Sequence, residues 1–419
     1  ALAWRGDLLP GALAALLTLP QAIALAALAG MPFESGLYLS LLPALAATLV
    51  GHSPLALSGP NTAASLVLFA SATTLAPPGS PDYVQQILAT TLFAGLFQVL
   101  FAVLRVGNLL LELPASVTRG LIAGTGLLTI GQQMGPLVGV PVNGINLIET
   151  LGQAMFFSSP HPGPLAIGVT AILAGFVARA AGRQSYMLLV ALVAGWAAAE
   201  VTDLISGSAN SGLERLGAIS MGDRFLSWPT IDPTDTVRFI AALRDGFTVA
   251  IVGALQTAIM ARIIASRTHG AMYVGKDIAG QAAMNLLAAF TSGFAGATSL
   301  NRSLANADAG AKSRAAGIYC VLFLLLGIVL AGPLLARIPL PAVAGVLVLV
   351  GWSMLASVRR EDFVNRVHLT ELLVTLVVTV LIGLLPAVIA GAFLAAYFRA
   401  LRHRDGSIPH ASHHAPGPH

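Results

Sequence analysis

Residues 293–303 read Gly-Phe-Ala-Gly-Ala-Thr-Ser-Leu-Asn-Arg-Ser, and residues 52–62 read His-Ser-Pro-Leu-Ala-Leu-Ser-Gly-Pro-Asn-Thr. Each stretch is rich in glycine and serine, and each precedes an apolar helix that is too short to cross a bilayer. Pro60 suits the first turn of such a helix, where a backbone N–H has no intrahelical partner to lose. These two interruptions of an otherwise apolar chain decide the expected fold.

The composition indicates that most of the chain lies in a membrane. Charged residues make up 10% of the 419 residues and apolar residues 56%, whereas about a quarter of a soluble domain is charged. Apolar runs of about 17 to 25 residues recur, and each can cross a hydrocarbon core of roughly 30 Å. The net charge of +4 comes from basic residues that stand singly or in pairs between these runs, so no nucleic-acid partner is expected.

The apolar runs predict an all-α polytopic membrane protein with fourteen transmembrane segments. The proline-rich residues 158–164 must break the sixth segment into a short piece and a full helix, which we count as one unit. The predicted segments are 8–27, 34–51, 60–74, 83–105, 111–133, 145–181, 185–205, 245–266, 277–292, 301–309, 315–336, 340–356, 368–383 and 385–402.

The distribution of basic residues predicts that both termini are cytoplasmic, in a plasma membrane or a cell inner membrane. The positive-inside rule is then satisfied, while the loop 206–243 carries several acidic residues that suit the outer face. The basic residues on the inner side would be Arg105, Arg179, Arg183, Arg262, Arg267, Lys276, Lys312, Arg314, Arg359, Arg360, Arg399, Arg402 and Arg404.

The two interrupted segments hold the third and tenth places, which are corresponding places in two halves of seven segments. An odd number of segments per half gives the halves opposite orientations, so the sequence predicts an inverted repeat. Residues 19–22, Leu-Pro-Gln-Ala, and residues 255–258, Leu-Gln-Thr-Ala, are a weak internal echo. Irregular backbone at membrane depth must be buried in protein or line a wet cavity.

Opposed half-helices would direct both N-termini at one place in the membrane, and their N–H groups and positive dipole ends favour an anion. Arg302 would add a full charge there. An isolated arginine at the bilayer centre costs at least about 2.5 kcal/mol, so it indicates a partner or a function. The alternative for each interruption is tight helix packing, as expected for Gly120-x-x-x-Gly124.

Several motifs resemble the sulfate permease family of anion transporters, whose vertebrate relatives include prestin. The resemblance covers essentially residues 1–402. The motifs, in order, are Gly6-Asp7-Leu8, Leu19-Pro20-Gln21, Ala29-Gly30-Met31-Pro32, Gly36-Leu37-Tyr38, Ser58-Gly59-Pro60, Ser299-Leu300-Asn301-Arg302-Ser303 with Asn306, and Gly310-Ala311-Lys312.

The resemblance implies a uracil-transporter-like fold with a seven-plus-seven inverted repeat, in which a mobile core moves against a gate. The core would comprise residues 1–107 and 244–337, and the gate residues 108–205 and 338–402. An extracellular connection, 206–243, would join the halves, and a disordered cytoplasmic tail would follow from 403 to 419. Family members usually carry a C-terminal cytoplasmic regulatory domain, the STAS domain, which is expected to be missing from this chain. Assembly as a homodimer is also expected.

The resemblance implies that the substrate binds between the third and tenth segments. The chain differs from the usual family residues at several positions there. Leu25 and Asn61 stand where relatives often have aromatic residues, which disfavours a chloride-tuned pocket. Gln256 stands where many relatives have an acidic residue, so Glu34 becomes the candidate proton site, unless it only caps its helix. The predicted substrate-binding residues are Gln21, Leu25, Asn61, Thr62, Asn301, Arg302 and Ser303.

Catalytic and cofactor motifs do not occur in the sequence. His-Glu-x-x-His is absent, and Gly124-Thr125-Gly126 lacks the third glycine and the strand of a dinucleotide fold. Acidic and basic residues of the gate segments, such as Glu112, Arg119 and Glu371, are expected to form structural pairs. The chain is therefore predicted not to be an enzyme and to bind neither a metal nor a cofactor.

The leading hypothesis is a secondary active transporter of a small anion that works by elevator-like alternating access. A C4-dicarboxylate such as fumarate or succinate, or sulfate, is the predicted substrate, because two helix ends and Arg302 offset about two negative charges. Inward movement against a negative interior costs about 2.3 kcal/mol per charge per 100 mV, so a co-transported proton is expected. The alternatives are an anion channel or a chloride/bicarbonate exchanger of the same fold, and a membrane scaffold without transport.

Overall fold

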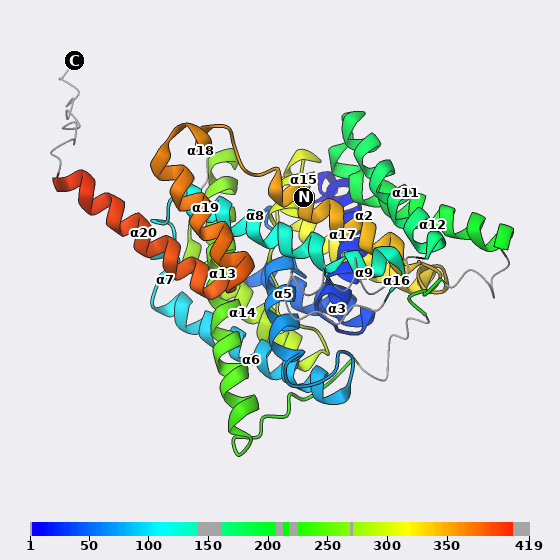
Figure 1. Ribbon diagram of the computed structural model, residues 1–419, viewed down its shortest axis with the longest axis horizontal. Helices are drawn as coiled ribbons and strands as arrows, with labels where there is room; N and C mark the ends of the chain where they lie inside the picture. The colour runs from blue at the N-terminus through cyan, green and yellow to red at the C-terminus, as the bar shows by residue number, and fades with distance from the viewer. Residues whose placement is uncertain are drawn as a thin grey trace.

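The computed structural model of the 419-residue chain describes residues 2–140, 152, 161–206, 213–217, 225–268 and 271–404. The described part is almost entirely helical, with two strands of two residues each, so the all-α prediction is confirmed. Figure 1 shows the helices packed as one body with α20 projecting at one side. Residues 405–419 of the predicted tail, and the proline-rich break at 158–160, lie outside the described residues.

The first half of the chain contains a short helix and a long helix, then a helix pair, a strand with a short helix, and a further series of helices. Its elements are α1 Leu2–Gly6, α2 Leu8–Leu28, α3 Phe33–Leu39, α4 Leu42–Val50, β1 Ser58–Gly59, α5 Thr62–Ala72, α6 Pro81–Val103, α7 Val106–Leu110, α8 Ala115–Gln132, α9 Met134–Val138, α11 Pro162–Ala180, the 3-10 helix Gln184–Tyr186 and α12 Met187–Ser206.

The second half repeats this order of elements. They are α13 Thr236–Thr268, α14 Val274–Phe290, β2 Ala297–Thr298, α15 Leu300–Asp308, α16 Ala315–Leu335, α17 Leu340–Leu355, α18 Glu361–Val364, α19 Arg366–Leu381 and α20 Leu384–Arg404. Helix α13 begins well before the predicted residue 245, because the Asp235 carboxylate accepts the backbone N–H of Arg238 at 3.1 Å and caps an extra stretch of helix. Helix α20 continues to Arg404, into the start of the predicted tail.

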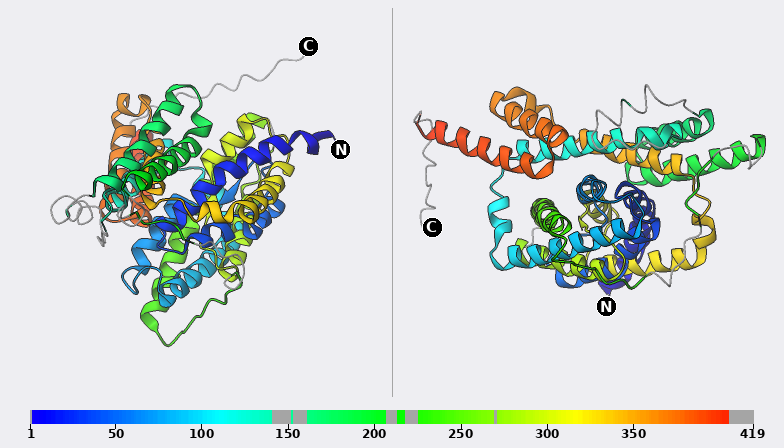
Figure 2. Two further views of the ribbon diagram at one scale, coloured as in Figure 1. Left: turned by 90° about the vertical axis from the view of Figure 1, so that its right-hand side faces the viewer. Right: turned by 60° about the horizontal axis from the view of Figure 1, so that its bottom comes forward.

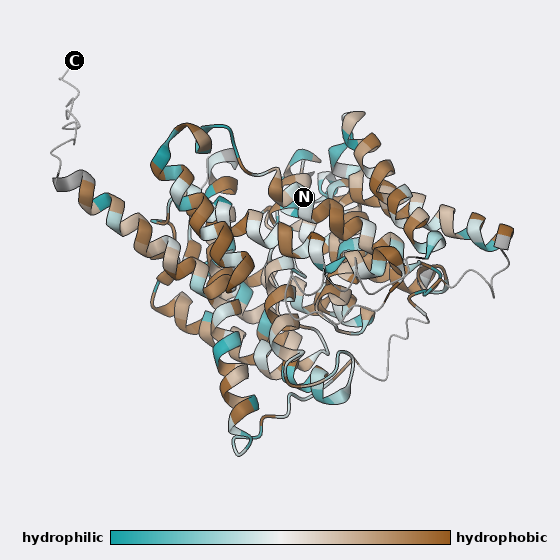
Figure 3. Cartoon of the chain, viewed as in Figure 1, coloured by the Kyte–Doolittle hydropathy of each residue, from teal (hydrophilic) through white to brown (hydrophobic). Residues whose placement is uncertain are grey.

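Seven of the described helices are long and apolar enough to cross a bilayer. Large apolar side chains such as Leu173, Val193, Leu330 and Phe393 are exposed on the outer helices, which is the pattern of a surface in contact with lipid. Figure 3 shows hydrophobic residues along all the long helices, including those at the periphery. The protein is an all-α polytopic membrane protein. The shorter apolar helix Thr62–Ala72 accounts for the first interrupted segment, and the second contains the nine-residue α15, which is more polar.

The helices pack into two layers, which Figure 2 shows edge-on in its right-hand view. The first layer consists of α2 to α6 and α13 to α16, and within it α6 contacts α13 and α14 while α2 contacts α16. The second layer consists of α8, α9, α11, α12, α17, α19 and α20, with α8 and α17 in contact at its centre. The two layers meet chiefly where α17 and α12 contact α2, and where α8 contacts α5.

The contacts repeat between the halves as an inverted repeat requires. The pair α2 and α16 has a counterpart in α13 and α6, and the pair α8 and α19 has one in α17 and α11. At the centre, a Cβ added to Gly126 would lie 2.6 Å from the carbonyl oxygen of Gly351, and one added to Gly351 would lie 2.7 Å from that of Gly126. This reciprocal backbone contact marks the place where the symmetry axis passes between α8 and α17.

Candidate functional site

Strands β1 and β2 pair antiparallel inside the first layer, with Ser58 opposite Thr298 and Gly59 opposite Ala297. A Cβ on Gly296 would lie 2.3 Å from the carbonyl oxygen of Gly59, so the two backbones approach more closely than any side chain permits. Helices α5 and α15 start just after these strands. Because the strands are antiparallel, the two helices run apart from a common centre, and the predicted meeting of their N-termini is observed.

Buried amide side chains hold this irregular backbone in place. The Gln281 amide donates to the hydroxyls of Ser58 at 2.6 Å and Thr298 at 2.9 Å. Asn285 accepts the N–H of Gly296 at 2.9 Å and donates to its carbonyl oxygen at 3.2 Å. Asn306 donates to the carbonyl oxygen of Leu55 at 3.2 Å. These bonds satisfy backbone groups that lack a helical partner, so the strand pair is a rigid support for the two helix ends.

The N-terminus of each short helix is capped by the side chain of the residue just before it. The Asn61 side-chain oxygen accepts the N–H groups of Ala63 at 3.0 Å and Ala64 at 3.4 Å. The Ser299 hydroxyl accepts the N–H of Arg302 at 3.5 Å. Since the Asn61 oxygen is used in this way, its NH₂ group is the part that remains to donate to a ligand.

Arg302 is the only charged side chain directly between the two short helices in the described part of the chain, and it is 1% exposed. Its Nη2 donates to the carbonyl oxygen of Pro60 at 3.1 Å, so it bridges α15 to the end of β1. Its Nε and Nη1 have no hydrogen-bond partner among the described residues. A buried cation with two unsatisfied donors is costly unless an anion completes it, which points to a ligand.

Two adjoining cavities open beside the helix ends. The central cavity, of about 160 Å³, is lined by residues that include Asn61, Thr62, Gln256, Asn301 and Ser353. The α15 cavity, of about 240 Å³, is lined by residues that include Gln21, Gln184, Asn301, Arg302, Asp308 and Ser353. Asn301 and Ser353 line both cavities, so the two adjoin at the N-terminus of α15, where polar and apolar side chains share the lining.

The structure brings five of the seven predicted substrate-binding residues to this space: Gln21, Asn61, Thr62, Asn301 and Arg302. Leu25 instead packs in the apolar core, 4% exposed, and its carbonyl oxygen accepts the Ser65 hydroxyl at 3.0 Å. Ser303 has a structural contact, since its hydroxyl donates to Ser299 at 2.7 Å and accepts the N–H of Leu57 at 2.9 Å.

Glu34 lies outside both linings, half-buried in the first turn of α3. A carboxylate there is stabilised by the positive end of the helix dipole. Among the described residues, the start of α3 has no side-chain capping hydrogen bond, so Glu34 stands apart from both cavities with only the helix dipole as its favourable contact.

Sequence analysis did not single out Ser353, Gln256 or Asp308 as lining residues. Ser353 lies in the last turn of the otherwise apolar α17, and Ser357 lies two residues beyond the end of that helix; two serines this close together after an apolar run are a signal in the sequence. Gln256 has a buried side-chain oxygen without a partner among the described residues, and it faces the central cavity from α13. Asp308, at the end of α15, adds a carboxylate to the α15 cavity.

The profile of the sulfate permease family matches residues 4–394. The chain belongs to the sulfate permease family. Relatives in this family include the bicarbonate transporter BicA of Picosynechococcus sp., which is 29% identical over 93% of this chain and 69% of its own length. A probable sulfate transporter of Mycobacterium tuberculosis is 27% identical over 96% of this chain and 72% of its own length.

Solved structures of sulfate permease relatives show the same fold. The transmembrane domain of a cyanobacterial BicA superposes with a TM-score of 0.81 at 24% identity, covering 92% of this chain and 97% of that domain. The murine anion transporter Slc26a9, in its inward-facing state, superposes with a TM-score of 0.81 at 18% identity, covering 95% of this chain and 68% of that protein. As a member of the sulfate permease family, the chain is a multi-pass anion transporter.

Proposed function

We propose that the protein is a secondary active transporter that binds a small oxyanion between the N-termini of α5 and α15. The observation that carries this proposal is Arg302, fully buried beside the α15 cavity, with two donor groups that have no partner among the described residues. Burial of this charge costs free energy that a bound anion would offset. A membrane scaffold without transport gives no reason for that cost. The binding groups would be Arg302, the amides of Gln21 and Asn61, and Asn301.

The proposed substrate is a divalent oxyanion, either a C4-dicarboxylate such as fumarate or succinate, or sulfate. Arg302 and two half-helix dipoles together offset about two negative charges. The central cavity and the α15 cavity adjoin through Asn301 and Ser353. This extended shape favours a dicarboxylate, because one carboxylate can reach Arg302 and Gln21 while the other reaches Asn61.

The proposed mechanism is elevator-like, with the first layer as the moving core and the second layer as the gate. The strand pair and both short helices belong to the first layer, so the groups that bind the anion would move together. Ser353 and Ser357 belong to the second layer and would contact the substrate in only one state. A multi-pass position in a plasma or inner membrane with cytoplasmic termini, and a homodimer, complete the proposal.

Proton coupling is proposed because a dianion enters a negative interior against about 2.3 kcal/mol per charge per 100 mV. Gln256 cannot titrate, and Glu34 lies outside the two cavities. The proton would therefore travel on the substrate or on Glu34, and these two routes differ in their response to Glu34→Gln. Transport of a monoprotonated anion would survive that substitution.

The test is uptake into proteoliposomes of fumarate, succinate, sulfate, bicarbonate, chloride and nitrate, with and without an inward proton gradient. We expect saturable, gradient-stimulated uptake of a divalent oxyanion, with trans-stimulation. Preference for chloride or bicarbonate would favour an exchanger, and large unitary currents would favour a channel. Absence of any anion flux from folded protein would leave the scaffold alternative.

A further inference from the structure

A third and larger cavity lies between the two layers on the other side of the strand pair. This α5 cavity, of about 460 Å³, is lined by the C-terminal half of α5, the start of α13, the end of α8 and the junction of α19 and α20. The α15 cavity is lined by α15, α2, the end of α17 and the junction before α12. These four walls correspond one to one under the inverted repeat, so the two cavities are symmetry mates.

The residues of α8 and α17 make this correspondence specific. Aligning Pro114 with Pro339 also aligns Gly120 with Gly345 and Gly126 with Gly351, the pair in reciprocal backbone contact. In the same alignment, Leu128 of the α5 cavity is the equivalent of Ser353 of the α15 cavity. The α8 and α17 walls therefore occupy equivalent places, whereas on α13 the lining residue Arg244 is nearer the start of its helix than Gln21 is on α2.

Because the repeat is inverted, the α5 cavity and the α15 cavity open toward opposite membrane faces. Helices α5 and α15 start at the common strand pair and run apart, and the α5 cavity lines up with the distal part of α5, from Leu66 to Ser71. On α13, Arg244 lines the α5 cavity and Gln256 lines the central cavity, about 18 Å apart along the axis at 1.5 Å per residue. The α5 cavity and the central cavity thus lie at different depths along α13.

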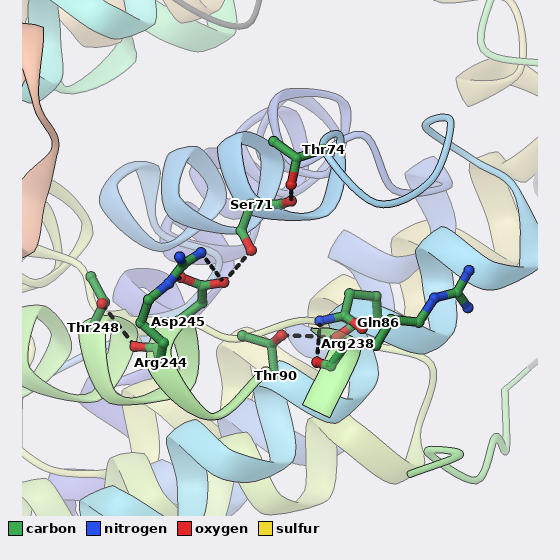
Figure 4. Close-up of polar contacts among 8 residues, drawn as sticks. All are labelled: Ser71, Thr74, Gln86, Thr90, Arg238, Arg244, Asp245 and Thr248. Atoms are coloured by element: carbon green, nitrogen blue, oxygen red, sulfur yellow. Dashed lines mark hydrogen bonds and ion pairs between the residues drawn. The ribbon is translucent and has the colours of Figure 1, made fainter. Parts of the chain in front are cut away.

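The α5 cavity is lined by one arginine, Arg244, whose guanidinium is fixed by hydrogen bonds. Arg244 donates from Nε and Nη2 to the Asp245 carboxylate at 2.9 and 3.2 Å, and the Ser71 hydroxyl donates to the same carboxylate (Figure 4). The Asp245 side chain is 8% exposed and that of Arg244 is 64% exposed. Both residues line the cavity, but the carboxylate is nearly buried with its oxygens occupied, and the guanidinium is the more exposed group of the pair.

We propose that the α5 cavity is the access site for the transported anion on the face opposite the α15 cavity, and that Arg244 captures a small oxyanion there. Asp245 and Ser71 orient the guanidinium, whose Nη1 makes no hydrogen bond among the described residues. This inference rests on the proposed function, since it assumes that the same anion goes on to Arg302. The interaction is weaker than at Arg302, because Arg244 is solvated and its charge is offset by Asp245.

The test uses Arg244→Cys in proteoliposomes, with Arg238→Cys as the matched control. Arg238 lies on the same helix, pairs with Asp82 at 2.9 Å, and points away from the Arg244 and Asp245 pair (Figure 4). It is also absent from the lining of the α5 cavity. Membrane-impermeant methanethiosulfonate reagents, one positively charged and one negatively charged, are added outside. They reach only molecules whose α5 cavity faces outward.

We expect Arg244→Cys to raise the half-saturating anion concentration for entry from the α5 side about fivefold at low ionic strength, and less at high salt. The positive reagent should restore entry and the negative reagent should not. Entry from the opposite face should be unchanged, and Arg238→Cys should behave as the parent protein. Arg244→Lys, which keeps the charge, should retain most of the parent affinity.

Equal entry by Arg244→Cys and Arg238→Cys would overturn the proposal, as would an equal loss from both faces. The buried Cys320 makes the reagent-treated parent protein the necessary reference. Arg302→Ala separates the two levels of inference, because it should abolish anion binding from either face. If Arg302→Ala loses anion transport and Arg244→Cys has no effect, the proposal of an access site is wrong. If Arg302→Ala transports normally, the proposed function itself is wrong.

Discussion

The guanidinium of Arg302 lies directly against the Cα of Gly59, so that a Cβ at position 59 would come 3.1 Å from Nη2 and 3.2 Å from Nη1. Gly59 also has φ +153°, a backbone conformation that residues with a side chain rarely adopt. Arginine and glycine belong to different halves of the chain, and the strand pair brings them together. The position of the charge therefore depends on the absence of a side chain at residue 59.

Gly59→Ala should displace the guanidinium and strain β1. We expect a loss of about 1–3 kcal/mol in the free energy of unfolding, because the alanine must adopt a disfavoured backbone conformation. Anion affinity should fall together with stability, which thermal unfolding with and without anion would measure. The control is Gly327→Ala on α16, where an added Cβ meets nothing within 4 Å. Gly59→Ala with unchanged anion affinity would contradict the contact.

Arg302→Ala should lower anion affinity by at least a factor of ten and leave the fold intact. The parent protein should gain about 2.7 kcal/mol of apparent stability at an anion concentration of 100 times its Kd, and a variant that binds tenfold more weakly should gain at most about 1.4 kcal/mol. Without anion, the variant should be as stable as the parent or more stable, because it loses an unsatisfied buried charge. A variant that is clearly less stable than the parent protein without anion would indicate a structural arginine. Arg302→Lys should bind weakly, since it keeps the charge and loses the planar fork.

Gln21→Leu should raise the half-saturating substrate concentration about tenfold with little change in the maximal rate. Gln21 lines the α15 cavity with Arg302, and one hydrogen bond to a charged ligand contributes about 1.5 kcal/mol. The measurement is the concentration dependence of uptake. Gln85→Leu is the control, because Gln85 accepts the N–H of Thr230 at 2.9 Å, away from both cavities. Normal uptake by Gln21→Leu would move the substrate away from α2.

Arg119→Met should destabilise the second layer without a direct effect on anion affinity. Arg119 on α8 forms an ion pair with Asp362, which is fully buried in α18. Removing one partner leaves a buried carboxylate uncompensated, at a cost of about 3–5 kcal/mol. The double variant Arg119→Met, Asp362→Leu should recover much of this loss, and chemical unfolding of all four proteins would give the coupling energy. Additive losses would show that the pair is not coupled.

The acidic and basic residues of the gate segments illustrate what residue type and position allow. They were predicted to form structural pairs, and Arg119 pairs with Asp362 while Glu371 accepts the Ser116 hydroxyl. The prediction follows from the cost of a lone charge in a membrane, which requires some partner. The identity of the partner does not follow, because Asp362 is 243 residues away along the chain.

Sequence alone determined the class of fold, because apolar runs of membrane length and two interruptions at corresponding places leave few other arrangements. It also identified five of the residues around the helix ends, since each lies within or beside an interruption or in the internal echo. Leu25 and Ser303 show its limit. Both lie one turn or less from lining residues, and only the rotation of α2 and α15 within the packed layer decides that Leu25 joins the core and that Ser303 bonds to Leu57.

The tertiary structure alone decided how the two halves meet. Antiparallel pairing of Ser58 and Gly59 with Thr298 and Ala297 sets the separation of the two helix ends, and Gln281 and Asn285 from α14 maintain it. The second layer adds Ser353 to the site. The inverted repeat produces a second cavity, the α5 cavity, which is lined by Arg244. Side chains far apart along the chain meet only through packing, because helical periodicity specifies which face of a helix is polar but not which element that face meets.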